Sequence, residues 1–373
     1  MRIVKLMLPV LIICILFSGC NQDESLADLA IVEAVGIDYK DDETSVVFQY
    51  LNLEKSNGTT DALSGGITSI ATGSSNGISN AVAATSSSLS KEIFFGQNKI
   101  IVFGREYIDY GIEKGLDYLL RSVDSRPDVL VAMSEKTANE VITNELSGAR
   151  IPAESLSDLL KTGEKNGFSA VVVVSDILNM YADKTSDIYL PVISPKEKNC
   201  DCSGIAVFSN EKYKATLNRD QTLGFLILKS KTDAGFINVD DKELGRVSLE
   251  MISSKAKNRM IVDGDEYVFE CDIKMALVLD EIENGITSAI DEKKIERIEA
   301  LVNSKIRELC TNAFNKCISE QSDALALGRY LARSHPEKYN AVKDDWKKEL
   351  PKIRIRINAS SNLEKVNDTA LSG

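Results

Sequence analysis

Histidine and tryptophan are nearly absent from this chain. Its 373 residues include one histidine, His335, and one tryptophan, Trp346. A Ser-His-Asp or Cys-His site would have to use His335, and the polar stretch around it favours a surface or capping role. Zinc would lack its usual imidazole ligands, and a sugar site would lack the tryptophan-rich platform typical of carbohydrate binding. These scarcities weaken an enzyme interpretation without abolishing it.

Phosphate-binding and metal-binding motifs are missing as well. The sequence has no GxxxxGK[ST] or GxGxxG loop, no HExxH pair and no EF-hand loop. It also has no basic patch with interleaved aromatic residues, and 56 acidic against 44 basic residues give a formal net charge of −12. Such an acidic chain is a poor candidate for nucleic-acid binding. We therefore expect no nucleic-acid partner, no metal and no cofactor.

Long apolar runs are limited to the N-terminus. Arg2 and Lys5 precede a short run from Leu6 to Phe17, and Ser18-Gly19-Cys20 follows. The run is shorter than the roughly 20 residues that span a bilayer, so it is typical of a secretory signal. A cysteine directly after two small residues predicts a lipoprotein signal at 1–19, with diacylglycerol and further acyl chains such as palmitate on Cys20. An ordinary signal or an uncleaved anchor helix is the alternative.

Five other cysteines follow in the expected mature chain, and an odd number argues against a complete disulfide framework. Cys271 alternates with apolar residues, which predicts a core position. Cys310 and Cys317 lie too far apart on a predicted helix to bond to each other. Cys200 and Cys202 form a C-x-C pair in a predicted loop, where a metal is disfavoured for want of further ligands.

The pattern of hydrophobic residues predicts hairpins and separate helices rather than regular βαβ alternation. Alternation around an acidic turn predicts a hairpin over 29–51, and the Ser/Gly/Thr-rich stretch from Ser56 to Gly77 predicts a loop. Apolar residues from Ile295 to Cys317 recur at helical spacing, and this face is expected to pack on a sheet rather than bind a partner. We expect an α+β fold with mixed or antiparallel sheets and packed helices.

The length predicts more than one domain. We expect the signal at 1–19, an N-terminal α+β domain at 20–195, a middle domain at 196–265 and a C-terminal domain at 266–373. The last begins near a long strand and ends with a strictly alternating strand that starts at Pro351. Lys352, Arg354 and Arg356 share one face of that strand. A solvated or edge-protecting role is favoured there over binding of acidic headgroups or an acidic partner.

Taken in order, several segments resemble the C subunit of bacterial spore germinant receptors, the Ger(x)C lipoprotein family. The resemblance covers nearly the whole chain, and each piece is weak alone. Departures are Phe17 in the lipid box and Gln97-Asn98 where such proteins often carry Gly-His. The matching segments are Leu29 to Val32 running to Asp38, Phe94 to Lys99, Arg126 to Val129, Leu190-Pro191, Gly204 to Phe208 with the hairpin to Asn218, Gly224, Asp323 to Gly328, His335-Pro336, Trp346 and the closing strand.

The resemblance implies a three-domain body on the outer face of the spore's inner membrane. There it would join two polytopic membrane subunits in a complex that senses nutrients, and the acyl chains on Cys20 would hold it at the membrane. The family supplies no catalytic residues, so Cys20 is the one functional residue carried over. The alternative is a solute-binding lipoprotein of a transporter, which predicts two α/β lobes around a ligand cleft. An extracytoplasmic hydrolase would need a cleft with a perturbed carboxylate pair.

Overall fold

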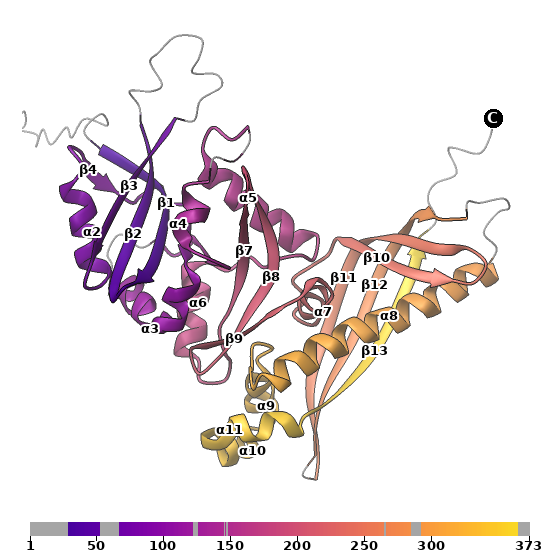
Figure 1. The fold of residues 1–373 in the computed structure, drawn as a ribbon. Helices are drawn as coiled ribbons and strands as arrows, with labels where there is room; N and C mark the ends of the chain where they lie inside the picture. The colour runs from indigo at the N-terminus through magenta and orange to yellow at the C-terminus, as the bar shows by residue number, and fades with distance from the viewer. Residues whose placement is uncertain are drawn as a thin grey trace, which may run out of the picture.

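Two β-sheets and the helices packed on them form the chain (Figure 1). The computed structural model describes residues 29–52, 67–121, 126–144, 146, 148–264, 266–284 and 292–364. The larger sheet has nine strands: β1 (Leu29–Lys40), β2 (Glu43–Leu51), β3 (Thr68–Ser75), β4 (Glu92–Phe94), β5 (Ile100–Phe103), β6 (Leu130–Ser134), β7 (Tyr189–Lys196), β8 (Asn199–Ser209) and β9 (Lys212–Leu217).

The larger sheet combines a parallel centre with antiparallel ends. Its order is β3-β2-β1-β5-β6-β7-β8-β9, with β4 beside β1. Strands β1, β5, β6 and β7 run parallel, whereas β1–β2–β3 and β7–β8–β9 are antiparallel. The predicted hairpins over 29–51 and 205–217 are confirmed. The mixed sheet with separate helices also confirms the expected α+β class.

Helices cover both faces of this sheet because its central strands are apolar on both sides. On one face, α4 (Ala138–Ile142) and α5 (Pro152–Lys165) pack against alternate residues such as Ile100 and Val102. On the other, α2 (Ile78–Ser87), α3 (Arg105–Arg121) and α6 (Val174–Ala182) cover the intervening residues, such as Ile101 and Phe103. The strand's two-residue period therefore divides the core into two layers.

The smaller sheet has four strands in the order β10-β11-β12-β13: β10 (Gly235–Asp241), β11 (Gly245–Asp263), β12 (Glu266–Ile282) and β13 (Arg354–Glu364). The long helix α8 (Glu292–Ser319) lies along one face of this sheet (Figure 1). Its apolar face is buried there, as predicted, together with Cys310 and Cys317. Cys271 on β12 is fully buried in the same core, which confirms the core position expected for it.

Helix α7 (Arg219–Leu228) links the two sheets. It follows β9 directly and packs on α8, so one continuous core includes residues of both sheets. The remaining short helices follow α8: α9 (Leu327–Ser334), α10 (Pro336–Val342), η4 (Lys343–Asp345), α11 (Trp346–Glu349) and η5 (Leu350–Lys352).

Two local predictions are wrong. Residues 68–75 of the expected loop from Ser56 to Gly77 form strand β3, which pairs with β2 along its whole length. Its small residues suit this place, because a side chain at Gly73 would collide with Thr85 of the overlying helix α2. Residues 56–66 of that loop lie outside the described residues. The C-x-C pair likewise lies in strand β8, not in a loop.

The expected boundary between 195 and 196 falls at the β7–β8 hairpin, inside the larger sheet. The middle segment, 196–265, thus contributes β8 and β9 to one sheet and β10 and β11 to the other. The division into three domains stays a prediction.

Replacement of Gly224 by alanine should force α7 away from α8. A Cβ atom at Gly224 would lie 2.1 Å from the backbone oxygen of Leu309. Neither backbone can move without disturbing the core around it, so we expect Gly224→Ala to lower the free energy of unfolding by roughly 2–3 kcal/mol. Urea denaturation of residues 20–373 carrying Cys20→Ser, called the unacylated chain below, measures this loss.

Ser304→Ala, at an exposed position of α8, is the matched control and should change stability by less than about 0.5 kcal/mol. A Gly224→Ala chain as stable as this control would show that the α7–α8 contact is not as tight as the structure has it.

Candidate functional site

Cys20, the residue predicted to carry the lipid, lies outside the described residues, as does the whole predicted signal. Within the described parts of the chain, no helix is long and apolar enough to cross a membrane. The tether therefore stays a prediction from the sequence.

The Cys200–Cys202 pair is held in the core beside α5 rather than exposed to a ligand. Cys200 is 3% exposed, and burial raises the pKa of its thiol to about 11. The Cys202 thiol contacts the backbone oxygen of Leu159 at 3.6 Å. The five cysteines in the described part of the chain are free thiols. Among the same residues, no group of three or more His, Cys, Asp and Glu side chains could hold a metal. Such buried thiols are poor nucleophiles and poor ligands.

His335 lies between α9 and α10, where its Nδ1 atom is 2.9 Å from the hydroxyl of Ser334. A GxSxG spacing does occur at Gly73 to Gly77, between β3 and α2. A serine nucleophile needs a histidine within hydrogen-bond reach. Since the chain's single histidine contacts Ser334 instead, the spacing has no catalytic partner here, and the stretch is the end of β3 with the short turn that leads to α2.

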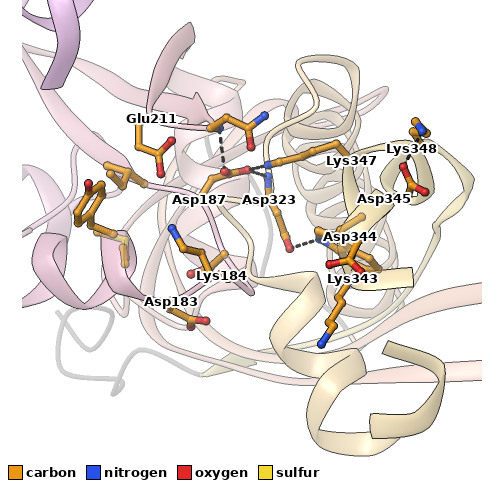
Figure 2. Close-up of a pocket in the computed structure, with 16 residues that line it drawn as sticks. Asp183, Lys184, Asp187, Glu211, Asp323, Lys343, Asp344, Asp345, Lys347 and Lys348 are labelled. Atoms are coloured by element: carbon orange, nitrogen blue, oxygen red, sulfur yellow. Dashed lines mark hydrogen bonds and ion pairs between the residues drawn. The ribbon is translucent and has the colours of Figure 1, made fainter. Parts of the chain in front are cut away.

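A cleft of about 580 Å³ is lined mainly by polar and charged side chains (Figure 2). It lies where the segment between α6 and β7 and the β8–β9 turn meet the short helices after α8. Both charge signs line it, including Lys184, Asp187, Glu211, Asp323 and Lys347. The two sheets of the molecule are joined at this place by polar contacts rather than by apolar packing alone.

Asp323 is the buried centre of these contacts. Its carboxylate accepts hydrogen bonds from the backbone N–H groups of Leu327 at 2.6 Å and Gly328 at 2.8 Å. It also accepts one from the indole N–H of Trp346 at 2.8 Å. The first two bonds satisfy donors at the start of α9, where the backbone would otherwise have free N–H groups. One side chain thus fixes the start of α9 and the position of α11.

Asp187 connects this centre to the larger sheet. The backbone N–H of Asp323 donates to the Asp187 carboxylate at 2.5 Å, and the Asp187 N–H donates to the Asp323 carbonyl at 3.1 Å. Lys347 forms an ion pair with the same carboxylate (Figure 2). Nearby, the Ser209 hydroxyl donates to the Gln321 carbonyl at 2.6 Å. We call this set of contacts the Asp187–Asp323 junction.

Two further contacts extend the junction on either side. Arg329 of α9 forms an ion pair with Asp183, with 3.0 Å between the Arg329 Nε and the carboxylate. On the other side, the Lys229 ammonium donates to the Ala324 carbonyl at 2.9 Å and lies 4.8 Å from the centre of the Tyr189 ring. The Arg329–Asp183 ion pair joins residues 146 positions apart in the sequence, and the Lys229–Ala324 hydrogen bond joins residues 95 positions apart.

Burial perturbs both titratable groups at the centre. It raises the pKa of Asp323 to about 7, and the neighbouring Asp187 carboxylate acts in the same direction, whereas the three N–H donors oppose the rise. Burial lowers the pKa of Lys229 to about 8, and the nearby cations of Lys231 and Arg329 lower it further. Perturbed values of this kind mark functional sites as well as structural networks.

The geometry favours a structural role. A general base needs a free lone pair directed at a substrate, but Asp323 is 1% exposed and its oxygens already accept three hydrogen bonds. Asp187 is engaged by two backbone N–H groups and by Lys347. The Asp187 and Asp323 carboxylates therefore hold chain segments together.

The sequence comparison with the family matched Asp323 to Gly328 and Trp346 as separate segments, and the structure brings them together. A Cβ atom at Gly328 would lie 3.0 Å from the Thr185 carbonyl and 3.1 Å from the Trp346 indole nitrogen, so a larger residue there would have to displace these groups by a few tenths of an ångström. Asp187 and Lys347 were missed. Their sequence signal is weak, since each is one charged residue in a polar stretch.

Replacement of Asp323 by alanine should loosen the junction. The change leaves three buried N–H donors without their acceptor, which costs about 1–3 kcal/mol for each group that water cannot reach. We expect Asp323→Ala to lower the free energy of unfolding of the unacylated chain by roughly 3–5 kcal/mol in urea denaturation. Asp345→Ala removes an exposed ion pair with Lys348 and should cost less than about 1 kcal/mol. Equal losses would contradict this account.

The same carboxyl predicts a pH dependence. Because the pKa of Asp323 is raised in the folded chain, its stabilising contribution is complete below the ordinary value near 4 and is lost as the pH rises through about 7. The stability advantage of the wild type over Asp323→Ala should therefore be larger at about pH 5 than at about pH 8, by roughly 2–3 kcal/mol. Urea denaturation at both values measures it, and an advantage that grows with pH would contradict the shift.

Two family models match the chain in tandem. The spore germination protein N-terminal domain matches residues 22–195. The spore germination B3/GerAC-like C-terminal family matches residues 203–367. Together they match every strand of both sheets in whole or in part, and they include both Asp187 and Asp323.

Similar proteins agree with these models. The spore germination protein KC of Bacillus subtilis (strain 168) is 24% identical, over 97% of this chain and 96% of that protein. The spore germination protein GerQC of Bacillus cereus is 24% identical, over 74% of this chain and 77% of that protein. The crystal structure of the GerBC protein has the same fold, with a TM-score of 0.61 and 14% identity over 89% of this chain and 97% of that chain.

These matches leave the solute-binding alternative without support. They confirm the resemblance found in the sequence: the chain belongs to the GerAC-like family of spore germination proteins and has the role of a germinant receptor subunit in germination.

Proposed function

We propose that this chain is the lipid-anchored C-type subunit of a nutrient germinant receptor and acts by docking rather than by catalysis. Diacylglyceryl Cys20, acylated after removal of residues 1–19, would hold it on the outer face of the spore's inner membrane. Two polytopic membrane subunits would be its partners. The observation that carries the proposal is the tandem family match over residues 22–195 and 203–367, which begins two residues after Cys20.

The proposed tether is supported by one observation on the described residues and by the energetics of acyl anchoring. No helix of the described ranges can cross a membrane, so attachment through Cys20 would supply the membrane contact that a receptor of polytopic subunits requires. Two acyl chains suffice for stable anchoring, since each buried methylene contributes about 0.8 kcal/mol. A single chain gives only marginal attachment.

The contacts at the polar cleft support the non-catalytic part of the proposal. The buried carboxyl with the largest rise in pKa, Asp323, is used to join chain segments. The single histidine contacts a neighbouring serine.

Cys20→Ala at the native locus tests the tether. We expect the protein to be lost from the spore membrane fraction and nutrient-triggered germination to fall strongly, because the remaining chain has no other predicted anchor. Cys202→Ala is the matched control, since it removes a thiol from the folded body and should leave membrane retention unchanged. Membrane fractionation and a germination assay on the same spores measure both effects.

Normal germination from spores that release the Cys20→Ala protein would contradict the tether as a requirement. Retention of that protein in the membrane, together with normal germination, would show that partner contacts or another anchor hold it there. Purification of tagged wild-type protein from detergent extracts tests the partners, and it should recover two multi-span membrane proteins.

A further inference from the structure

One face of the smaller sheet is covered by helices and the other is exposed. Helix α8 packs on β10 and β13, and α7 and α9 pack on β11, all on the face that carries Phe269, Ile273 and Leu277. The alternate residues point the other way, and Lys255, Lys257 and many of their neighbours are exposed there. The described residues on this outer face belong to strands β10 to β13.

Three adjacent rows of the outer face carry an excess of positive charge. The rows run across β11, β12 and β13 and are fixed by the strand register. Their nine positions hold five cations and two carboxylates, within a chain whose net charge is −12. The rows are Lys255, Lys274 and Ser360; Lys257, Asp272 and Asn358; and Arg259, Glu270 and Arg356.

Both carboxylates of these rows are already neutralised. Glu270 lies between Arg259, with which it forms an ion pair, and Arg356 at 3.3 Å. Asp272 accepts from Arg259 at 2.6 Å and from the Asn358 amide at 2.8 Å. Arg356 of the closing strand is thus bound to a neighbouring acid, and Arg354 of the same strand forms an ion pair with Glu266 at 3.4 Å. Lys255, Lys257 and Lys274 therefore supply the positive charge that this face presents outward.

Lys255 and Lys274 are placed directly opposite each other on neighbouring antiparallel strands. Like charges at opposite positions destabilise a sheet, so this pair does not serve folding. Two charges held side by side on a rigid surface form a binding feature for an anion or an anionic surface.

Apolar side chains accompany the lysines. Ile252 is 42% exposed at the bulge of β11, three residues before Lys255. Ile261 and Val268 lie half-buried beyond the Arg259 row, opposite each other. Lysines that surround exposed apolar side chains are typical of surfaces that lie in the interface of a bilayer. In the other direction the next row is Ser253, Ala276 and Asn362, and the row after it carries Glu250 and Glu364, which mark the limit of the cationic area.

We propose that this outer face, centred on Lys255 and Lys274, rests against an anionic phospholipid surface and orients the body on the membrane. The proposal rests on the proposed tether, which brings the body within reach of a bilayer. Tethering raises the effective concentration of the face at the lipid, so a weak intrinsic affinity is sufficient. The acidic remainder of the chain is repelled from the same lipid, which selects this face over the others.

Vesicle flotation of the unacylated chain tests the face independently of the tether. The probes are vesicles of phosphatidylcholine mixed with phosphatidylglycerol, and vesicles of phosphatidylcholine alone. At low ionic strength we expect binding to the mixed vesicles only, with loss of binding at high salt. The double variant Lys255→Gln and Lys274→Gln should lower the partition coefficient on the order of tenfold. It should fold normally, because it removes a repulsion.

The matched control is Lys212→Gln with Lys214→Gln, two exposed positions of β9 that lower the net charge equally. Partitioning of this control should equal that of the wild type. No binding of the wild type to mixed vesicles, or equal losses in both double variants, would overturn the proposal. Binding of a polyglutamate peptide that requires Lys255 and Lys274, without vesicle binding, would also overturn it and would assign the face to an acidic protein partner. None of these results depends on Cys20, so the tether is judged separately by its own experiment.

Discussion

The burial of one carboxylate, that of Asp323, is the constraint on which the arrangement of the two sheets depends. It accepts two hydrogen bonds from the start of α9 and one from Trp346, and its backbone pairs with Asp187 beside the larger sheet. A buried carboxyl is costly unless every partner is present. The short helices after α8 can therefore fold into place only when the larger sheet supplies Asp187 and the neighbouring contacts. Apolar packing of α7 on α8 brings the two sheets together, and this polar network fixes how they are placed relative to each other.

The parts of the fold with a strong periodic signal could be predicted from the sequence. The hairpins, the α8 face and the core position of Cys271 follow from alternation or helical spacing, which report burial directly. Strand β3 could not be predicted, because its Ser, Thr and Gly residues resemble a loop. It forms because neighbouring β2 offers a complete edge and α2 leaves room only for small residues. Tertiary contacts override local preference there.

The candidate site, like the fold, could be predicted from the sequence only in part. Asp323 and Trp346 were found through the family resemblance, but their contact was not predictable, because it joins segments with no shared local pattern. Asp187 and Lys347 carried no signal, since a lone charged residue in a polar stretch is usually solvated. The strand register was equally inaccessible, and the pairing of Lys255 with Lys274 depends on it. Periodicity shows on which face of the sheet a side chain lies, whereas strand register shows which residue of the neighbouring strand lies opposite it.

The account joins a rigid two-sheet body to a role in a membrane receptor, and its central claim is that the Asp187–Asp323 junction couples the sheets. Amide hydrogen exchange of the unacylated chain, compared with its Asp323→Ala variant, tests this claim most directly. The account predicts faster exchange on both sides of the junction, at residues 183–188 as well as 323–350, while the sheet centres stay protected. Faster exchange confined to residues 323–350, with 183–188 unchanged, would contradict it.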